Sequence, residues 1–175
     1  MAQIQSVKLQ KSGTLTVTYN ETILPSNQEE ESYIRNIIYE SDLTVHPDLF
    51  NALQAFLSPM VIICEVVDEK KAFSDNEEEH DKILNRLQAD YTVKGIHFSE
   101  RKEVECFIIT GQKKLSTGKK MNLVTPLTSM DDLDFPGGDE IDKLKELLIV
   151  EVEKYIFNGK HGGPKQGKLD LNDQA

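Results

Sequence analysis

The sequence is poor in cysteine and has no long apolar segment, and each absence argues against a class of protein. Its two cysteines, Cys64 and Cys106, lie inside apolar stretches and form no CxxC pair. We therefore expect neither a secreted disulfide framework nor a zinc site, and buried free thiols fit a reducing cytoplasm. The longest apolar stretch, residues 60–67, is far shorter than the roughly 20 residues that cross a bilayer. No membrane span is expected, and residues 1–10 lack the pattern of a signal peptide.

Local motifs of a catalytic, metal or nucleotide site are also missing. The four histidines lie far apart, and no GxSxG motif supports a nucleophile. Residues 111–120 end like a phosphate-binding loop, but six residues separate Gly111 from Gly118, and Lys120 stands where Ser or Thr should bind magnesium. We expect no catalytic residue, no metal and no cofactor, and therefore a protein that is not an enzyme.

Acidic residues outnumber basic ones, although one stretch of the chain is basic. The formal net charge of −10 argues against binding duplex DNA over the whole surface, because neutralising phosphates requires concentrated Lys and Arg. Acids dominate residues 26–90. The balance reverses in residues 91–125, whose basic residues are Lys94, Arg101, Lys102, Lys113, Lys114, Lys119 and Lys120.

The first half of the chain predicts a hairpin followed by helical segments. Residues 4–19 alternate apolar and polar side chains around Ser12-Gly13, a pattern typical of a β-hairpin. Residues 33–38 fit either a short helix or a strand. A core helix is predicted from Pro47, because Pro suits the first helical turn and apolar residues then recur at helical spacing. Residues 60–67 are interpreted as a kinked continuation after Pro59, with a buried strand as the alternative.

The second half predicts an acidic helix, a sheet and a closing helix. The three segments are residues 73–90, a three-stranded antiparallel meander over residues 92–125, and residues 141–156 with one continuous apolar face. Asn158-Gly159 is a helix stop signal. Residues 160–175 are rich in glycine and lack the apolar area to fold alone. We expect one domain over residues 1–159 and a flexible polar tail over residues 160–175.

These elements predict an α+β fold with a single antiparallel sheet of about five strands. The sheet would pack against two main helices, and the acidic helix would be an insertion. If both helices cover one face of the sheet, the other face or its edge would present the basic meander.

The charge pattern indicates two candidate binding surfaces. Cationic strands interleaved with aromatic residues could bind single-stranded nucleic acid, because bases stack and lysines follow the phosphates. The candidate nucleic-acid-binding residues are Lys94, Lys113, Lys114, Lys119 and Lys120, with Tyr91 and Phe98 as stacking residues. The candidate residues for binding a protein partner are the acids Glu77, Glu78, Glu79 and Asp81. Lysines at turns are also common solubilising residues, and an acidic run commonly marks a solvated helix start.

Several stretches resemble an uncharacterised family of small proteins encoded in the early regions of bacteriophages and prophages. They are HPDLFNALQAFL with the following ICE, VKGIHFS, FIITGQKKL, NLVTP and EVEKYIFNGK, together about half of the chain. The resemblance implies proximity to replication and recombination functions and the cytoplasm of a bacterial host. With the charge pattern, it predicts a non-enzymatic accessory protein that contacts single-stranded nucleic acid or a replication and recombination complex. The alternative is an acidic interaction or inhibitor protein that acts on a host factor.

Overall fold

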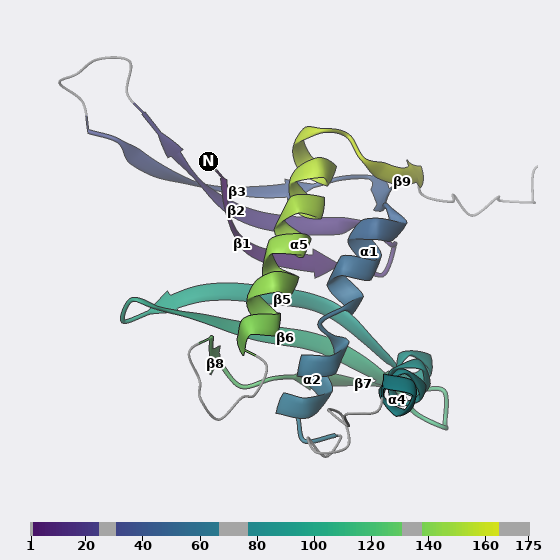
Figure 1. Cartoon of the computed structure of the whole chain (residues 1–175). Helices are drawn as coiled ribbons and strands as arrows, with labels where there is room; N and C mark the ends of the chain where they lie inside the picture. The colour runs from purple at the N-terminus through teal and green to yellow at the C-terminus, as the bar shows by residue number, and fades with distance from the viewer. Residues whose placement is uncertain (1, 25–30, 67–76, 131–137, 165–175) are drawn as a thin grey trace, which may run out of the picture.

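The computed structural model describes residues 2–24, 31–66, 77–130 and 138–164, which form an α+β fold built on one main sheet (Figure 1). All strand pairs of the sheet are antiparallel. The predicted fold class is therefore confirmed.

The main sheet is larger than the five strands predicted. Its path runs in the order β3-β2-β1-β5-β6-β7, and the short strand β8 also pairs with β6. The bounds are β1 Ala2–Leu9, β2 Leu15–Ile23, β3 Tyr33–Glu40, β5 Tyr91–Arg101, β6 Val104–Lys114, β7 Lys120–Val124 and β8 Thr128–Ser129. The β1–β2 hairpin and the β5–β6–β7 meander are the two predicted β units. Residues 33–38, which fitted a helix or a strand, belong to β3, because this segment pairs with β2 along its length.

The helices also follow the sequence pattern. Their bounds are α1 Pro47–Gln54, α2 Leu57–Ile63, α4 Glu77–Asp90 and α5 Gly138–Phe157. The side chain of His46 caps α1 by accepting a hydrogen bond from the backbone N–H of Asp48, and Pro47 begins the first turn. The kinked continuation predicted over residues 60–67 is confirmed only in part, because α2 ends at Ile63, residues 64–66 form a turn, and residue 67 lies outside the described residues. Pro59 lies in the first turn of α2, where its missing N–H costs nothing. Helix α4 confirms the acidic helix from residue 77 onward; the predicted start at residues 73–76 lies outside the described residues.

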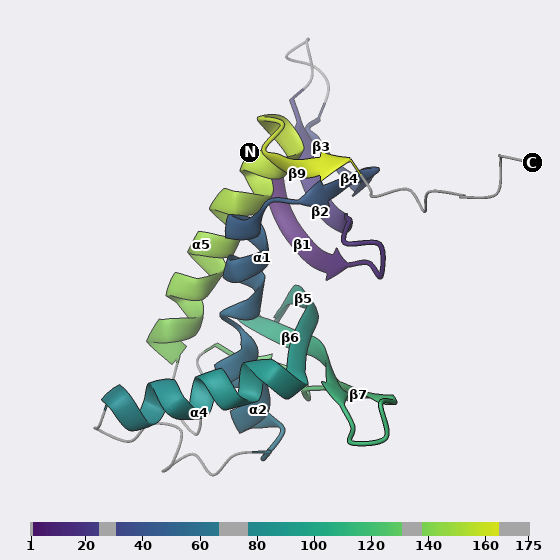
Figure 2. The same ribbon diagram turned by 90° about the vertical axis from the view of Figure 1, so that its right-hand side faces the viewer.

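The core lies between one face of the sheet and the helices α1, α2 and α5. Figure 2 shows α1 and α5 on the same side of the sheet. The largest fully buried side chains from both layers are Val7, Leu15, Val17, Leu49, Leu53, Phe56, Met60, Phe107, Ile109, Ile141, Leu148 and Tyr155. Gly111 allows α2 to approach β6, because a Cβ at this position would lie 2.3 Å from Met60 Sδ. None of the helices that the structure describes covers the opposite face of the sheet, which we call the uncovered face.

The sheet consists of two halves joined by a short junction. Strand β1 pairs with β5 through Ser6–His97, Val7–Ile96 and Lys8–Gly95. Gly95 permits this close approach, since a Cβ there would lie 2.7 Å from the carbonyl oxygen of Val7. A bulge interrupts each strand beside the junction, in β1 between Ile4 and Ser6 and in β5 between Val93 and Gly95.

Helix α5 spans both halves of the sheet. Near its C-terminal end, the Phe157 ring lies 5.9 Å from the Tyr19 ring of β2, and the Tyr155 ring lies 6.0 Å from the Tyr39 ring of β3. Nearer its N-terminal end, Lys145 forms an ion pair with Glu105 of β6. The helix therefore holds the two halves together where strand pairing is sparse.

The predicted tail boundary at residue 160 is wrong. Residues His161–Pro164 form strand β9, which pairs with β4 (Leu43–Val45) in a second, two-stranded sheet. Lys160 Nζ lies 2.6 Å from Asp48 Oδ2 and 2.8 Å from Glu151 Oε2, so it attaches this segment to α1 and α5. The pairing with β4 and the contact of the His161 ring with the buried Tyr155 ring, 4.6 Å between ring centres, also hold residues 160–164. Residues 165–175 lie outside the described residues.

Candidate nucleic-acid interface

Strand register identifies the side chains on the uncovered face of the sheet. Residues opposite each other in an antiparallel ladder point to the same face. The row that crosses the sheet through Lys8 is Glu40, Thr16, Lys8, Gly95, Thr110 and Val124. Amide pairs lie on the same face, where Asn36 Nδ2 donates to Asn20 Oδ1 and Gln112 Nε2 donates to Asn122 Oδ1, both at 3.0 Å. The uncovered face therefore carries polar side chains and lysines at defined positions, with exposed apolar side chains at its two edges, Ile34 and Ile38 on β3 and Val124 on β7.

A groove of about 870 Å³ opens beside the β1–β5 junction, where the end of β1 and the β1–β2 turn lie next to the start of β5. Its basic lining residues are Lys8, Lys11 and Lys94, and Glu40 and Asp42 also line it. None of the three lysines forms an ion pair with any other residue that the structure describes. The β1–β2 and β6–β7 turns project to the same side of the sheet (Figure 2). The groove thus brings unpaired cations from separate strands together.

The bulge in β5 places Lys94 at this groove, and Gln54 of α1 supports the bulge. Gln54 Nε2 donates to the carbonyl oxygen of Val93, and the Val93 N–H donates to Gln54 Oε1, each at 3.0 Å. Pairing with β1 has ended at Gly95, so the Gln54 amide takes the place of a neighbouring strand. The core helix α1 therefore fixes the backbone from which Lys94 extends.

The basic surface continues from Lys94 toward β7. Burial lowers the pKa of Lys94, and the positive charge of Lys120 lowers it further, so these two ammonium groups lie within electrostatic reach of each other. Lys114 is the register partner of Lys120 and shares its face. We call Lys8, Lys11, Lys94, Lys114 and Lys120 the basic track. A bound anion would relieve the repulsion between Lys94 and Lys120.

Two of the predicted lysines lie outside this track. Lys113 pairs with Tyr91 in the ladder and therefore points to the helix side, where its Nζ lies 5.1 Å from the centre of the Tyr91 ring. The interaction with Tyr91 raises the pKa of Lys113. Lys119 lies in the β6–β7 turn, where its carbonyl oxygen accepts a hydrogen bond from the Leu115 N–H. The structure brings together Lys94, Lys114 and Lys120, but not Lys113.

The prediction that Tyr91 and Phe98 stack on bases is wrong. The two side chains are 7% and 6% exposed and belong to the hydrophobic core. The bulge at Lys94 shifts the alternation of β5 by one residue, so Ile96 and Phe98 point inward together with Tyr91. Among the described residues, no aromatic side chain lines the groove.

The candidate acidic surface is only partly described. The backbone of Glu77, Glu78, Glu79 and Asp81 lies in α4, but their side chains lie outside the described part of the structure. Figures 1 and 2 show α4 beside α2, at the end of the β5–β7 half. The proposed protein-interaction role of these acids therefore stays a prediction.

Sequence reasoning missed Lys8 and Lys11. Both precede the basic stretch by a long distance in the chain, and Lys8 alternates with apolar residues in a strand, which is a common surface pattern. They join Lys94 only because β1 pairs with β5. Only knowledge of this pairing could have predicted their place at the groove.

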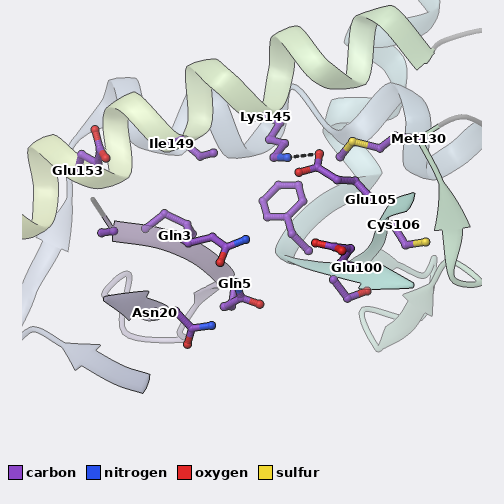
Figure 3. A pocket seen from close by; sticks show the side chains of 14 residues that line it. Gln3, Gln5, Asn20, Glu100, Glu105, Cys106, Met130, Lys145, Ile149 and Glu153 are labelled. Carbon is purple, nitrogen blue, oxygen red and sulfur yellow. Dashed lines mark hydrogen bonds and ion pairs between the residues drawn. The ribbon is translucent and has the colours of Figure 1, made fainter. Parts of the chain in front are cut away.

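A second hollow of about 520 Å³ lies on the helix side of the junction (Figure 3). Glu100 and Glu105 are opposite each other in the ladder, and Lys145 of α5 binds Glu105 while its Nζ lies 5.5 Å from the Phe98 ring centre. Cys106 also lines this hollow and donates a weak hydrogen bond to the Val104 carbonyl oxygen. Because the lysine here is already neutralised, this hollow is a poorer phosphate site than the groove on the uncovered face.

Comparisons with known proteins identified no relative. No family model, no curated protein and no solved structure matches the chain. Within the described ranges, no group of three or more His, Cys, Asp and Glu side chains is placed to hold a metal ion. Among the same residues, no helix has both the length and the apolar character needed to cross a membrane.

Proposed function

We propose that this chain is a non-enzymatic accessory protein that binds the sugar-phosphate backbone of single-stranded nucleic acid along the basic track. The observation that carries the proposal is the convergence of Lys8, Lys11 and Lys94 on one groove, with Lys120 close enough to lower the pKa of Lys94. In a chain of net charge −10, a gathering of unpaired cations favours an anionic ligand at this place.

Single strands fit this surface better than a duplex. The track contains few lysines, and each phosphate contact contributes a limited, salt-sensitive share of the binding free energy. The groove side chains Gln10 and Ser12 carry N–H and O–H groups that can donate hydrogen bonds to a flexible backbone. A duplex would also extend beyond the track onto an acidic molecule, which repels it.

The burial of Tyr91 and Phe98 defines the kind of recognition we expect. Stacking on aromatic side chains contributes about 1–3 kcal/mol per base in single-strand binding proteins, and the track lacks it. Binding should therefore be modest, insensitive to base sequence and strongly dependent on salt. Glu40 and Asp42, which also line the groove, would direct the phosphates toward the lysines.

The test is the affinity for a fluorescent oligo(dT) strand, measured by anisotropy at several salt concentrations. The variant Lys94→Gln/Lys120→Gln removes two phosphate contacts, and its log–log salt slope should be about 1.4 units shallower than that of the wild type. The matched control, Lys102→Gln/Lys143→Gln, makes the same change in net charge at two exposed lysines away from the track.

The control variant should bind like the wild type. The proposal fails if the wild type shows no salt-dependent binding, or if both double variants weaken binding equally. Circular dichroism of each variant confirms that the fold is retained.

A further inference from the structure

The outer edge of β3 is an unpaired strand edge. Strand β3 ends the strand path, and in the described part of the chain no strand pairs with its outer side. It pairs with β2 through eight consecutive residue pairs without a bulge. Its outward N–H and C=O groups therefore form a regular template for another strand.

This edge is apolar and exposed. Tyr33, Ile34 and Ile38 are 59%, 69% and 65% exposed, although they lie within one eight-residue strand. Ile34 and Ile38 share the uncovered face, because they pair with Thr22 and Thr18. Such a strand is a common site of pairing between chains.

The two ends of the sheet differ in how they are protected. The opposite edge strand, β7, has five residues and begins at Lys120 next to the turn that carries Lys119. Lysines and short length are the usual devices that block edge pairing. Strand β3 has no lysine, proline or bulge, and its Arg35 is bound to Glu21 of β2 at 2.7 Å. Its edge therefore carries none of these protecting features.

We propose that a second copy of this chain binds here, through antiparallel β3–β3 pairing centred on Asn36. A two-fold axis perpendicular to the sheet would pass between Asn36 and its counterpart in the partner subunit. The six-strand path of each copy would then continue into one sheet.

The strand sequence is self-complementary in this register. In a continuous sheet, paired residues of the two copies must point to the same face. The two-fold axis therefore passes between one residue and its own counterpart, and not between two neighbouring residue pairs. Centring on Asn36 places Ile34 opposite Ile38 of the partner subunit and Tyr33 opposite Tyr39 of the partner subunit. The exposed isoleucines Ile34 and Ile38 of each copy would then cover those of the other.

The neighbouring registers are less favourable. Centring on Arg35 places two guanidinium groups opposite each other, and like charges in that position are destabilising. Centring on Ile37 places Ile34 opposite Glu40 of the partner subunit, and centring on Ile38 places it opposite Asp42 of the partner subunit. Charge and apolar contact therefore favour the Asn36 register.

The proposed dimer makes no use of the basic track and stands independently of the proposed function. Each copy carries a net charge of −10, so added salt screens the repulsion between copies and should favour dimerisation. Salt has the opposite effect on nucleic-acid binding. The failure of one proposal is therefore distinguishable from failure of the other.

Sedimentation velocity of the full chain without nucleic acid, over a range of protein and salt concentrations, tests the dimer. We expect a monomer–dimer equilibrium that shifts toward dimer as salt rises. Ile34→Lys and Ile38→Glu should each give monomers, because each places a charge opposite an isoleucine. The matched control Val124→Lys alters a side chain that is 60% exposed on the other edge strand, and it should leave the dimer intact.

The register is tested by combining the two edge substitutions. In Ile34→Lys/Ile38→Glu, each new lysine faces a glutamate of the partner subunit, so the double variant should dimerise again. If the wild type is monomeric at all concentrations, the proposal is overturned. This result is expected if the β3 edge binds a strand of a different protein and not a second copy of the chain. A wild-type dimer that survives the single substitutions also overturns it, because the contact then lies elsewhere.

Discussion

At the scale of single residues, the position of Lys94 depends on the side-chain amide of Gln54. Both hydrogen bonds of this amide go to the backbone of Val93, at the bulge from which Lys94 extends. Gln54→Met keeps the size of the side chain but leaves the Val93 N–H and C=O without partners, which we expect to lower the free energy of unfolding by about 2 kcal/mol. The urea midpoint measures this loss, and affinity for oligo(dT) should fall with it because the bulge is no longer held.

Asn51→Met is the control for this prediction, since Asn51 is an exposed residue of the same helix. Its midpoint should stay near that of the wild type. Equal midpoints for Gln54→Met and the wild type would show that the amide does not support the bulge.

Single residues also explain why part of the site escaped prediction. Adjacent lysines on a strand point to opposite faces, so Lys113 and Lys114 were separable from sequence once the strand was assigned. The burial of Phe98 could not be predicted from the sequence. The bulge at Lys94 reverses the alternation of β5 after Val93, and no local residue pattern marks this bulge. Lys8 joins the groove only because β1 pairs with β5, a strand about half of the chain length away in sequence.

At the scale of elements, the sequence predicted the segments that have a long apolar period. It did not predict the short strand β9. Alternation predicted the β1–β2 hairpin and the β5–β6–β7 meander, and a continuous stripe predicted α5. Strand β9 has four residues and no apolar pattern. It is held instead by the ion pairs of Lys160 and by the pairing with β4. Such contacts depend on tertiary structure and leave no local signal.

The attachment of β9 should depend on pH. The pKa values of Asp48 and Glu151 are lowered mainly by hydrogen bonds from lysines, from Lys160 to Asp48 and from Lys154 and Lys160 to Glu151. A carboxyl group whose pKa is lowered by folding stabilises the fold at pH values above its pKa in the unfolded chain, which is about 4. This stabilisation is lost as pH falls through the lower pKa of the folded state. Lys160→Met should therefore lower the urea midpoint at pH 7 and reduce its decrease between about pH 5 and pH 3.

Lys143→Met, at an exposed position of α5, is the matched control and should keep the wild-type pH dependence. If Lys160→Met also keeps it, Lys160 does not hold the segment through these carboxylates.

At the scale of the whole molecule, the sheet separates two kinds of surface. One face packs against the helices and forms the core, while the other remains uncovered and carries the basic track on a chain of net charge −10. The β3 edge adds an apolar surface at one end of the same sheet. Both proposed contacts thus use parts of the sheet that the helices leave free.

Lysine modification with and without oligo(dT), quantified by mass spectrometry, tests the central claim most directly. A strand of about 16 nucleotides covers one site of this kind. We predict that bound oligo(dT) protects Lys8, Lys94, Lys114 and Lys120, while Lys113 and Lys143 stay equally reactive. Unchanged reactivity at all six lysines, or protection of Lys113 and Lys143 together with the others, would contradict a nucleic-acid site on the uncovered face.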